Sequence, residues 1–299
     1  MSGGASRASR SGRRRLLPVG LLVAASLACA GGSGGSVESD LSLVPHPTMA
    51  GRCGDDEPGR YTDELFPVPT VTVVSYADGL DADLYVPTGD TATCRAAIVW
   101  VHGGGFTGGT RNGPAERAWG SALARRGYTV LSIDYRLGEG EQFGVADAGD
   151  PGRLVAVAAA VADAQRAVRW LRESAASLHV DPLRIALGGT SAGAMTALGA
   201  ALTATDAERV CSVVSVAGAI REAWLGDGAP SALFVHGRAD LSVSFESAEA
   251  AVAAIGSTGA ETELVVVRGA GHEITGVPPN EVVTAVADWL LVHVATACG

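Results

Sequence analysis

Short apolar segments alternate along most of the chain with segments whose apolar residues recur at helical spacing. The apolar segments predict strands at residues 69–76, 80–87, 96–103, 128–135, 184–189, 210–218, 231–237 and 262–269. The helical segments predict helices at residues 114–127, 152–176, 192–204, 244–256 and 280–296. The first two strands flank an Ala-Asp-Gly turn and are expected to pair as a hairpin. Because the later strands are apolar throughout, we expect a mainly parallel sheet with helices on both faces.

The first sixty residues have a different character. Five arginines precede or open the apolar stretch that ends at residue 30, which is too short for a stable transmembrane helix and is typical of an export signal. Ala28-Cys29-Ala30 suits an ordinary signal peptidase, whereas Ser26 to Cys29 resembles a lipoprotein signal in which Cys29 would carry lipid. Both remain open. We therefore expect an export signal at 1–30, a flexible linker at 31–60 and one domain at 61–299.

Such a signal predicts a secreted, periplasmic or lipid-anchored protein with no transmembrane helix in its mature chain. Four cysteines would then remain: Cys53, Cys94, Cys211 and Cys298. An even number in an exported protein favours two disulfides, for which three pairings are possible. Proximity along the chain favours Cys53 with Cys94, and Cys211 with Cys298.

Composition narrows the range of functions. With 299 residues and 47% hydrophobic content, the chain can bury one sizeable core. It contains no lysine, which excludes a Walker A loop, a Ser-Lys dyad and any Schiff-base mechanism. The net charge of −10 argues against nucleic acid as a partner.

One serine stands in a pattern that predicts a nucleophile. Gly189-Thr190-Ser191-Ala192-Gly193 follows the apolar strand at 184–189 and opens a helix, which is the G-x-S-x-G arrangement. A sharp strand-to-helix turn of this kind needs residues without side chains on both sides of the serine. The alternative is a turn in which small residues only allow close helix packing.

A glycine triplet follows an earlier strand, in the segment from His102 to Phe106. Successive glycines let backbone N–H groups point into a site, where they can stabilise the oxyanion of a tetrahedral intermediate. This triplet, the later G-x-S-x-G serine and IDYRL at 133–137 together resemble the α/β-hydrolase superfamily. The nearest groups are the hormone-sensitive-lipase-like esterases and the feruloyl and acetylxylan esterases.

The resemblance covers roughly residues 65–296 and implies an α/β-hydrolase fold with an N-terminal antiparallel hairpin. It implies an oxyanion hole built by Gly103, Gly104, Gly105 and Ala192, in which the last three donate N–H groups and Gly103 shapes the turn. His102 would orient this loop without a catalytic role. Asp134, Tyr135 and Arg136 would belong to the scaffold.

Two later loops supply an acid and a base. Asp240 follows the strand at 231–237 and resembles the family's acid, while Glu246 is a rival placed inside the next predicted helix. His272 follows the strand at 262–269 and completes the order Ser, Asp, His that α/β-hydrolases use. His236 is expected to support the acid loop. His46, His179 and His293 lack such context and are expected to lie at the surface or in packing.

These residues predict a serine hydrolase that cleaves carboxylic esters through an acyl-enzyme, with no cofactor and no metal. Its substrate would be a small-molecule or polysaccharide-linked ester. A serine peptidase of the prolyl-oligopeptidase type and a non-catalytic binding protein on the same fold remain as alternatives. The glycine triplet argues against the first, and the complete set of three residues argues against the second.

The chain departs from the lipase-like pattern in two places. That group commonly has an acid where Thr190 stands. It also commonly has a substantial lid, whereas only residues 219–230 separate two strands here, so we expect no large lid insertion. The linker and the loop at 138–152 could still cover the cleft. We expect Phe106, Trp224 and Leu241 to build a small acyl pocket that favours short chains.

Overall fold

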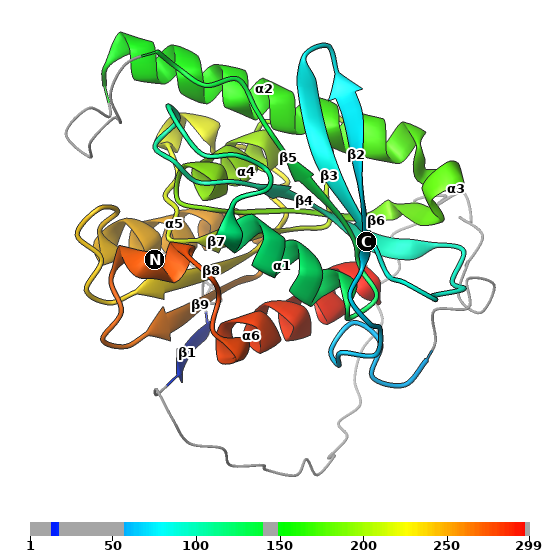
Figure 1. Cartoon of the computed structure of the whole chain (residues 1–299). Helices are drawn as coiled ribbons and strands as arrows, with labels where there is room; N and C mark the ends of the chain where they lie inside the picture. The colour runs from blue at the N-terminus through cyan, green and yellow to red at the C-terminus, as the bar shows by residue number, and fades with distance from the viewer. Residues whose placement is uncertain (1–12, 18–56, 140–148, 297–299) are drawn as a thin grey trace, which may run out of the picture.

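The computed structural model describes residues 13–17, 57–139 and 149–296 (Figure 1). Cys29, Cys53, Cys298 and His46 lie outside the described residues, as does most of the predicted export signal and linker.

Nine strands and six α-helices make up the described part of the chain. The strands are β1 (Arg13–Leu17), β2 (Thr70–Ala77), β3 (Leu80–Val86), β4 (Arg95–Val101), β5 (Thr129–Ile133), β6 (Val180–Thr190), β7 (Ser212–Val216), β8 (Ser231–Gly237) and β9 (Thr262–Val267). The α-helices are α1 (Pro114–Ala124), α2 (Pro151–Glu173), α3 (Ala175–Leu178), α4 (Ala192–Leu202), α5 (Phe245–Ser257) and α6 (Asn280–Leu290). Short helical turns are η2 (Glu222–Trp224), η3 (His272–Thr275) and η4 (Leu291–Ala295).

All nine strands form one sheet in the order β1-β9-β8-β7-β6-β4-β5-β3-β2. The hairpin β2–β3 pairs antiparallel, and β3 also joins β5 antiparallel, while all other neighbours are parallel. Only η2 lies between β7 and β8, so no lid domain is inserted there. The prediction of an α/β-hydrolase fold with a mainly parallel sheet and an N-terminal hairpin is confirmed.

Helices cover both faces of this sheet (Figure 1). One apolar core joins the sheet to α2, α4 and α5, and a second joins its other face to α1 and α6. Strand β4 lies between these layers, and all seven of its residues are buried. This double burial explains why the central strands are apolar at every position rather than at alternate ones.

Some boundaries differ from those that the sequence predicts. Helix α1 ends at Ala124 instead of Gly127, because the chain turns through Gly127 at φ +102° to enter β5. Helix α6 ends at Leu290 and continues as the π-helical turn η4. Strand β1 pairs in parallel with β9 at the edge of the sheet, although its residues lie within the predicted export signal. The export signal itself stays a prediction.

The end of the predicted linker packs against the domain. Arg60 is 4% exposed and forms an ion pair with Asp90, and Tyr61 is buried beside Tyr128. The backbone N–H of Tyr61 donates to the carbonyl of Arg126 over 2.7 Å. These contacts fasten the entry to the hairpin onto the loop that follows α1.

Candidate active site

Ser191 lies at the turn between β6 and α4, with an unusual backbone conformation of φ 53° and ψ −119°. Its N–H donates to the carbonyl of Val216 over 2.8 Å, which holds the turn against β7. A Cβ atom on Gly189 or Gly193 would overlap the carbonyl oxygen of Val101 in β4. The two glycines are therefore required by close approach, and the strained serine is held out at the helix N-terminus.

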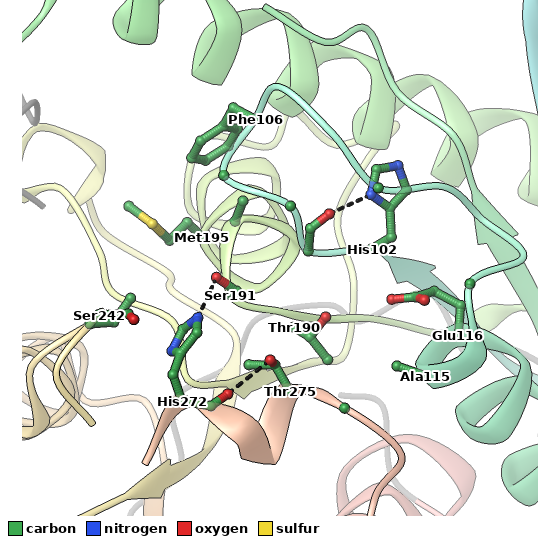
Figure 2. Close-up of a pocket in the computed structure, with 18 of the residues that line it drawn as sticks. His102, Phe106, Ala115, Glu116, Thr190, Ser191, Met195, Ser242, His272 and Thr275 are labelled. Atoms are coloured by element: carbon green, nitrogen blue, oxygen red, sulfur yellow. Dashed lines mark hydrogen bonds between the residues drawn. The ribbon is translucent and has the colours of Figure 1, made fainter. Parts of the chain in front are cut away.

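The structure brings Ser191, His272 and Asp240 together. Ser191 Oγ lies 2.9 Å from His272 Nε2, and His272 Nδ1 lies 2.8 Å from Asp240 Oδ2. Asp240 follows β8, and His272 opens η3 after β9, so all three stand at carboxyl ends of parallel strands. Figure 2 shows the bond from Ser191 to His272, together with the bond from Thr275 to the His272 carbonyl.

Asp240 is held in place by further donors. Its Oδ1 accepts the backbone N–H groups of Ser242 and Val243 over 2.8 and 2.9 Å. Burial alone would raise the pKa of Asp240, but the hydrogen bonds from His272 and from the two N–H groups outweigh it and lower that pKa. The carboxylate therefore stays ionised and accepts from His272 Nδ1, which leaves Nε2 free to face Ser191.

His236 supports the acid loop. Its Nε2 lies 2.9 Å from the Val243 carbonyl oxygen and 3.5 Å from Asp240 Oδ2, and its side chain is fully buried. Burial lowers the pKa of His236 despite these two acceptors, so the ring is neutral at pH 7. Glu246 is exposed in the first turn of α5.

The glycine loop from His102 to Phe106 lies beside the serine. Gly104 and Gly105 have φ values of +117° and +62°, and a Cβ on Gly104 would overlap the Gly108 carbonyl. Gly103 differs from both, because its φ is not positive and its carbonyl oxygen lies 2.6 Å from His102 Nδ1. Gly103 thus shapes the loop, while Gly104, Gly105 and Ala192 line the cleft with Ser191.

His102 is a buried part of this loop. Its ring stacks on Tyr135 with 4.3 Å between centroids. Burial lowers the pKa of His102, although the hydrogen bond with Gly103 and the negative charge of Asp134 oppose this shift. Of the other histidines, His179 ends α3 in the left-handed conformation, and His293 packs on Trp289. Neither lies in the cleft.

A cleft of about 970 Å³ opens above Ser191 and His272. Phe106 and Leu241 line it as expected, but Trp224 does not. Trp224 instead lines a separate hollow over α2 and packs on α4 near Gly199, so its assignment to the acyl pocket was wrong. The short connection after β7 turns its side chain toward the helices rather than toward the serine.

Three of the lining residues, Glu116, Arg153 and Met195, were not predicted. Met195 follows Ser191 by one helical turn, a spacing that would have suggested it. Arg153 lies in the first turn of α2, with its guanidinium 6.0 Å from the centre of the Phe106 ring. Within the described residues, no cluster of metal-ligating side chains is found. No described helix combines the length and apolarity that a membrane span requires.

Two family models match overlapping parts of the chain. BD-FAE matches residues 82–221, and the model described as alpha/beta hydrolase fold matches residues 155–293. Together the two matches span residues 82–293 and make the chain similar to the α/β-hydrolase superfamily, whose fold it has. Between them, the two matched segments include the glycine loop, Ser191, Asp240 and His272.

Several similar proteins are esterases. Esterase B1 of Culex pipiens is 30% identical over 129 residues, and phenmedipham hydrolase of Pseudarthrobacter oxydans is 35% identical over 119 residues. These matches cover 41% and 39% of the chain but only 22% of either relative. The chain therefore aligns with about a fifth of the length of these curated relatives.

Solved structures match over more of their length. The apo form of Thermogutta terrifontis esterase 2 has a TM-score of 0.59 at 27% identity, covering 78% of this chain and 97% of that one. A truncated carbohydrate esterase from gut microbiota has a TM-score of 0.61 at 19% identity, covering 78% and 99%. The second likeness concerns the fold alone.

Proposed function

We propose that this protein is a serine esterase whose triad is Ser191, His272 and Asp240. The continuous hydrogen-bonded path from Ser191 Oγ through the His272 ring to Asp240 carries the proposal. Similarity to esterases supports the reaction class. A serine hydroxyl needs such a neighbouring base to become an effective nucleophile at neutral pH.

In the proposed reaction, His272 Nε2 takes the Ser191 proton as Oγ attacks the ester carbonyl. Asp240 keeps the proton on Nδ1 and stabilises the imidazolium that forms. The N–H groups of Gly104, Gly105 and Ala192 receive the oxyanion, and His272 then protonates the leaving alcohol. Water attacks the acyl-enzyme with His272 again as base, which releases the acid and restores Ser191.

For the substrate, we propose a dissolved ester with a short acyl group, either a small molecule or a substituent on a polysaccharide. The enclosed apolar lining near Ser191 consists of a few side chains, with Phe106 buried and Met195 half-buried. Leu241 at the rim is 96% exposed and offers little enclosed surface. A long acyl chain would extend past this lining into water.

We also propose that the chain is exported and carries two disulfides. Cys94 and Cys211 are each disulfide-bonded, which supports this proposal. Their expected partners, Cys53 and Cys298, lie outside the described residues, so the pairing stays a prediction, as does a lipid anchor on Cys29.

The test uses a p-nitrophenyl ester of acetate or butyrate and the matching anilide. The wild type should hydrolyse the esters, and Ser191→Ala should reduce the rate on the order of 10⁴-fold or more, since triad members act as a unit. Ser257→Ala at the exposed end of α5 is the control and should retain full activity. Near-normal turnover by folded Ser191→Ala would overturn the proposal, and faster cleavage of the anilide would favour a peptidase.

A further inference from the structure

An arginine lies in the cleft and has no part in the proposed reaction. Arg153, in the first turn of α2, is the only arginine among the described residues that line the cleft, and the chain contains no lysine. A cation at the N-terminus of a helix is disfavoured by the helix dipole, and the first turn of α2 carries no acidic residue. Helix α2 itself therefore gains nothing from an arginine at this position.

The start of α2 and the Phe106 ring together fix where the guanidinium of Arg153 lies. The side chain of Asp150, the N-cap residue, accepts the backbone N–H of Arg153 over 2.9 Å, which fixes the backbone from which the arginine extends. The guanidinium carbon lies 6.0 Å from the centre of the Phe106 ring, where the face of the ring attracts a cation. The positive charge is thus held at the wall of the cleft.

Phe106 is in turn held by the glycine loop. Its φ of +67° lies in a region that bulky residues rarely adopt. Its carbonyl accepts the N–H of Gly138 over 2.7 Å, and its side chain is 1% exposed. A strained conformation of this kind persists only where the surroundings enforce it, and such conformations gather at binding sites. The loop therefore gives the ring beneath Arg153 a defined place in the cleft.

The proposed reaction indicates which half of the substrate lies on this side of the cleft. His272 protonates the leaving alcohol, so the alcohol must lie toward His272. Figure 2 shows Phe106 and Met195 on the other side of Ser191 from His272. The acyl group bonded to Ser191 therefore extends toward Phe106 and Met195. Arg153, beside Phe106, lies on the acyl side of the cleft.

We propose that Arg153 determines substrate specificity by binding a carboxylate at the far end of a short acyl group. The preferred substrate is then a monoester of a short dicarboxylic acid. This inference names the substrate class of the proposed esterase and rests on that proposed function. A guanidinium matches a carboxylate with two parallel N–H···O bonds, which gives direction as well as charge. The bound carboxylate takes no part in the bond changes at Ser191.

The other charges of the cleft leave room for such a group. Glu116 is the only Asp or Glu among the described residues that line it, and it is 7% exposed. Burial raises the pKa of Glu116, which favours its neutral form. Figure 2 shows Glu116 on the other side of Ser191 from Met195, and so apart from the acyl side. The net charge of −10 acts at longer range and is screened beyond about 8 Å at 0.15 M ionic strength.

The experiment uses the benzyl monoesters of glutaric and adipic acid at this ionic strength. Each is paired with the ester whose far carboxyl group is replaced by a neutral amide of the same shape. We expect the wild type to show a kcat/KM for the acid on the order of 10- to 100-fold above that for the amide, because a charge-assisted bond is lost with the amide. Arg153→Gln should lower this ratio to about one. Arg153→Lys should keep part of the preference, since it retains the charge but not the paired N–H donors.

Arg209→Gln is the matched control, because it removes the same charge from an exposed position outside the cleft. It should keep the wild-type ratio. A wild-type ratio near one would overturn the inference. So would an equal loss on both esters in Arg153→Gln, which would mean that Arg153 only holds Phe106 in place.

Two further outcomes separate the inference from its basis. Should Arg153→Gln not fold, Arg153→Lys must show a lower ratio than the wild type, and an unchanged ratio would overturn the inference. A wild type that hydrolyses neither these esters nor p-nitrophenyl butyrate would refute the proposed function. Hydrolysis of both members of each pair at equal rates would refute this inference alone.

Discussion

Asp240 illustrates how single residues of this site are fixed by the fold. Its two oxygens accept from three donors, and two of them are backbone N–H groups that no side-chain substitution removes. An asparagine at this position would keep one acceptor oxygen but add an NH₂ group. Either the amide donors would face backbone N–H groups, or the NH₂ group would face His272 and favour the wrong ring tautomer.

We therefore expect Asp240→Asn to lower kcat on the order of 10³- to 10⁴-fold while the protein stays folded. Glu246→Gln should remain near the wild-type rate, because Glu246 is exposed whereas Asp240 accepts from His272 Nδ1. Steady-state kinetics with circular dichroism on both variants provide the measurement. The opposite ranking would assign the acid role to Glu246.

The residues of the site could be predicted where the chemistry dictates a pattern along the chain. Ser191 stands between glycines, and Asp240 and His272 each follow an apolar strand, so the sequence order was enough to propose them. Glu116 has no such pattern, since its burial depends on how α1 packs against the glycine loop. Trp224 was misplaced for the same reason, because the direction of a side chain in a short connection is set by tertiary packing.

At the scale of elements, the site depends on how closely α4 approaches β4. Gly189 and Gly193 face the Val101 carbonyl from the two sides of Ser191, and Gly193 also approaches the His102 carbonyl. The approach lets the first turn of α4 rest directly on the end of β4. It also brings Ala192 next to the glycine loop that follows β4.

Gly193→Ala should therefore lower the free energy of unfolding by about 1–3 kcal/mol, because a methyl group must displace backbone rather than a flexible side chain. Activity should fall as the turn moves. Gly226→Ala is the control, since a Cβ there meets no atom within 4 Å. Urea denaturation of both variants measures the difference, and equal midpoints would show that the turn has room for a side chain.

The strands and helices could be predicted from apolar periodicity because each central strand is buried on both faces. Their ends could not be predicted as well. The turn of Gly127 and the π-helical turn after α6 depend on where neighbouring elements leave space. Strand β1 was not predicted, because an arginine-rich segment followed by an apolar stretch resembles an export signal more than an edge strand.

For the whole molecule, buried histidines link stability to pH. Burial lowers the pKa of His102, His236 and His293 below the ordinary value of 6.5. The unfolded chain therefore binds protons at these sites at a higher pH than the folded chain does. Their contribution to stability is complete above pH 6.5 and is lost as the pH falls through the lowered values.

The urea concentration at the unfolding midpoint should accordingly decrease as the pH is lowered from about 7 to about 5, with ionic strength held constant. His293→Phe keeps a ring against Trp289 and removes one titrating group, so its midpoint should depend less on pH than that of the wild type. A midpoint that stays level or rises on acidification would contradict the assignment of these rings as neutral.

The openness of the cleft leads to the last prediction, which concerns acyl-chain length. Only η2 lies between β7 and β8, so this connection provides no apolar cover that would have to open at a lipid surface. Each further methylene gains about 0.8 kcal/mol only where apolar surface receives it, and the rim residues Leu241 and Val277 are 96% and 64% exposed. We expect kcat/KM for p-nitrophenyl esters to peak between acetyl and about hexanoyl. Measurements below and above each ester's aggregation threshold should show no jump in rate, because dissolved substrate already reaches Ser191. A preference for chains of about twelve carbons, or activation by aggregates, would mean that further apolar surface covers the cleft and that the enzyme is a lipase.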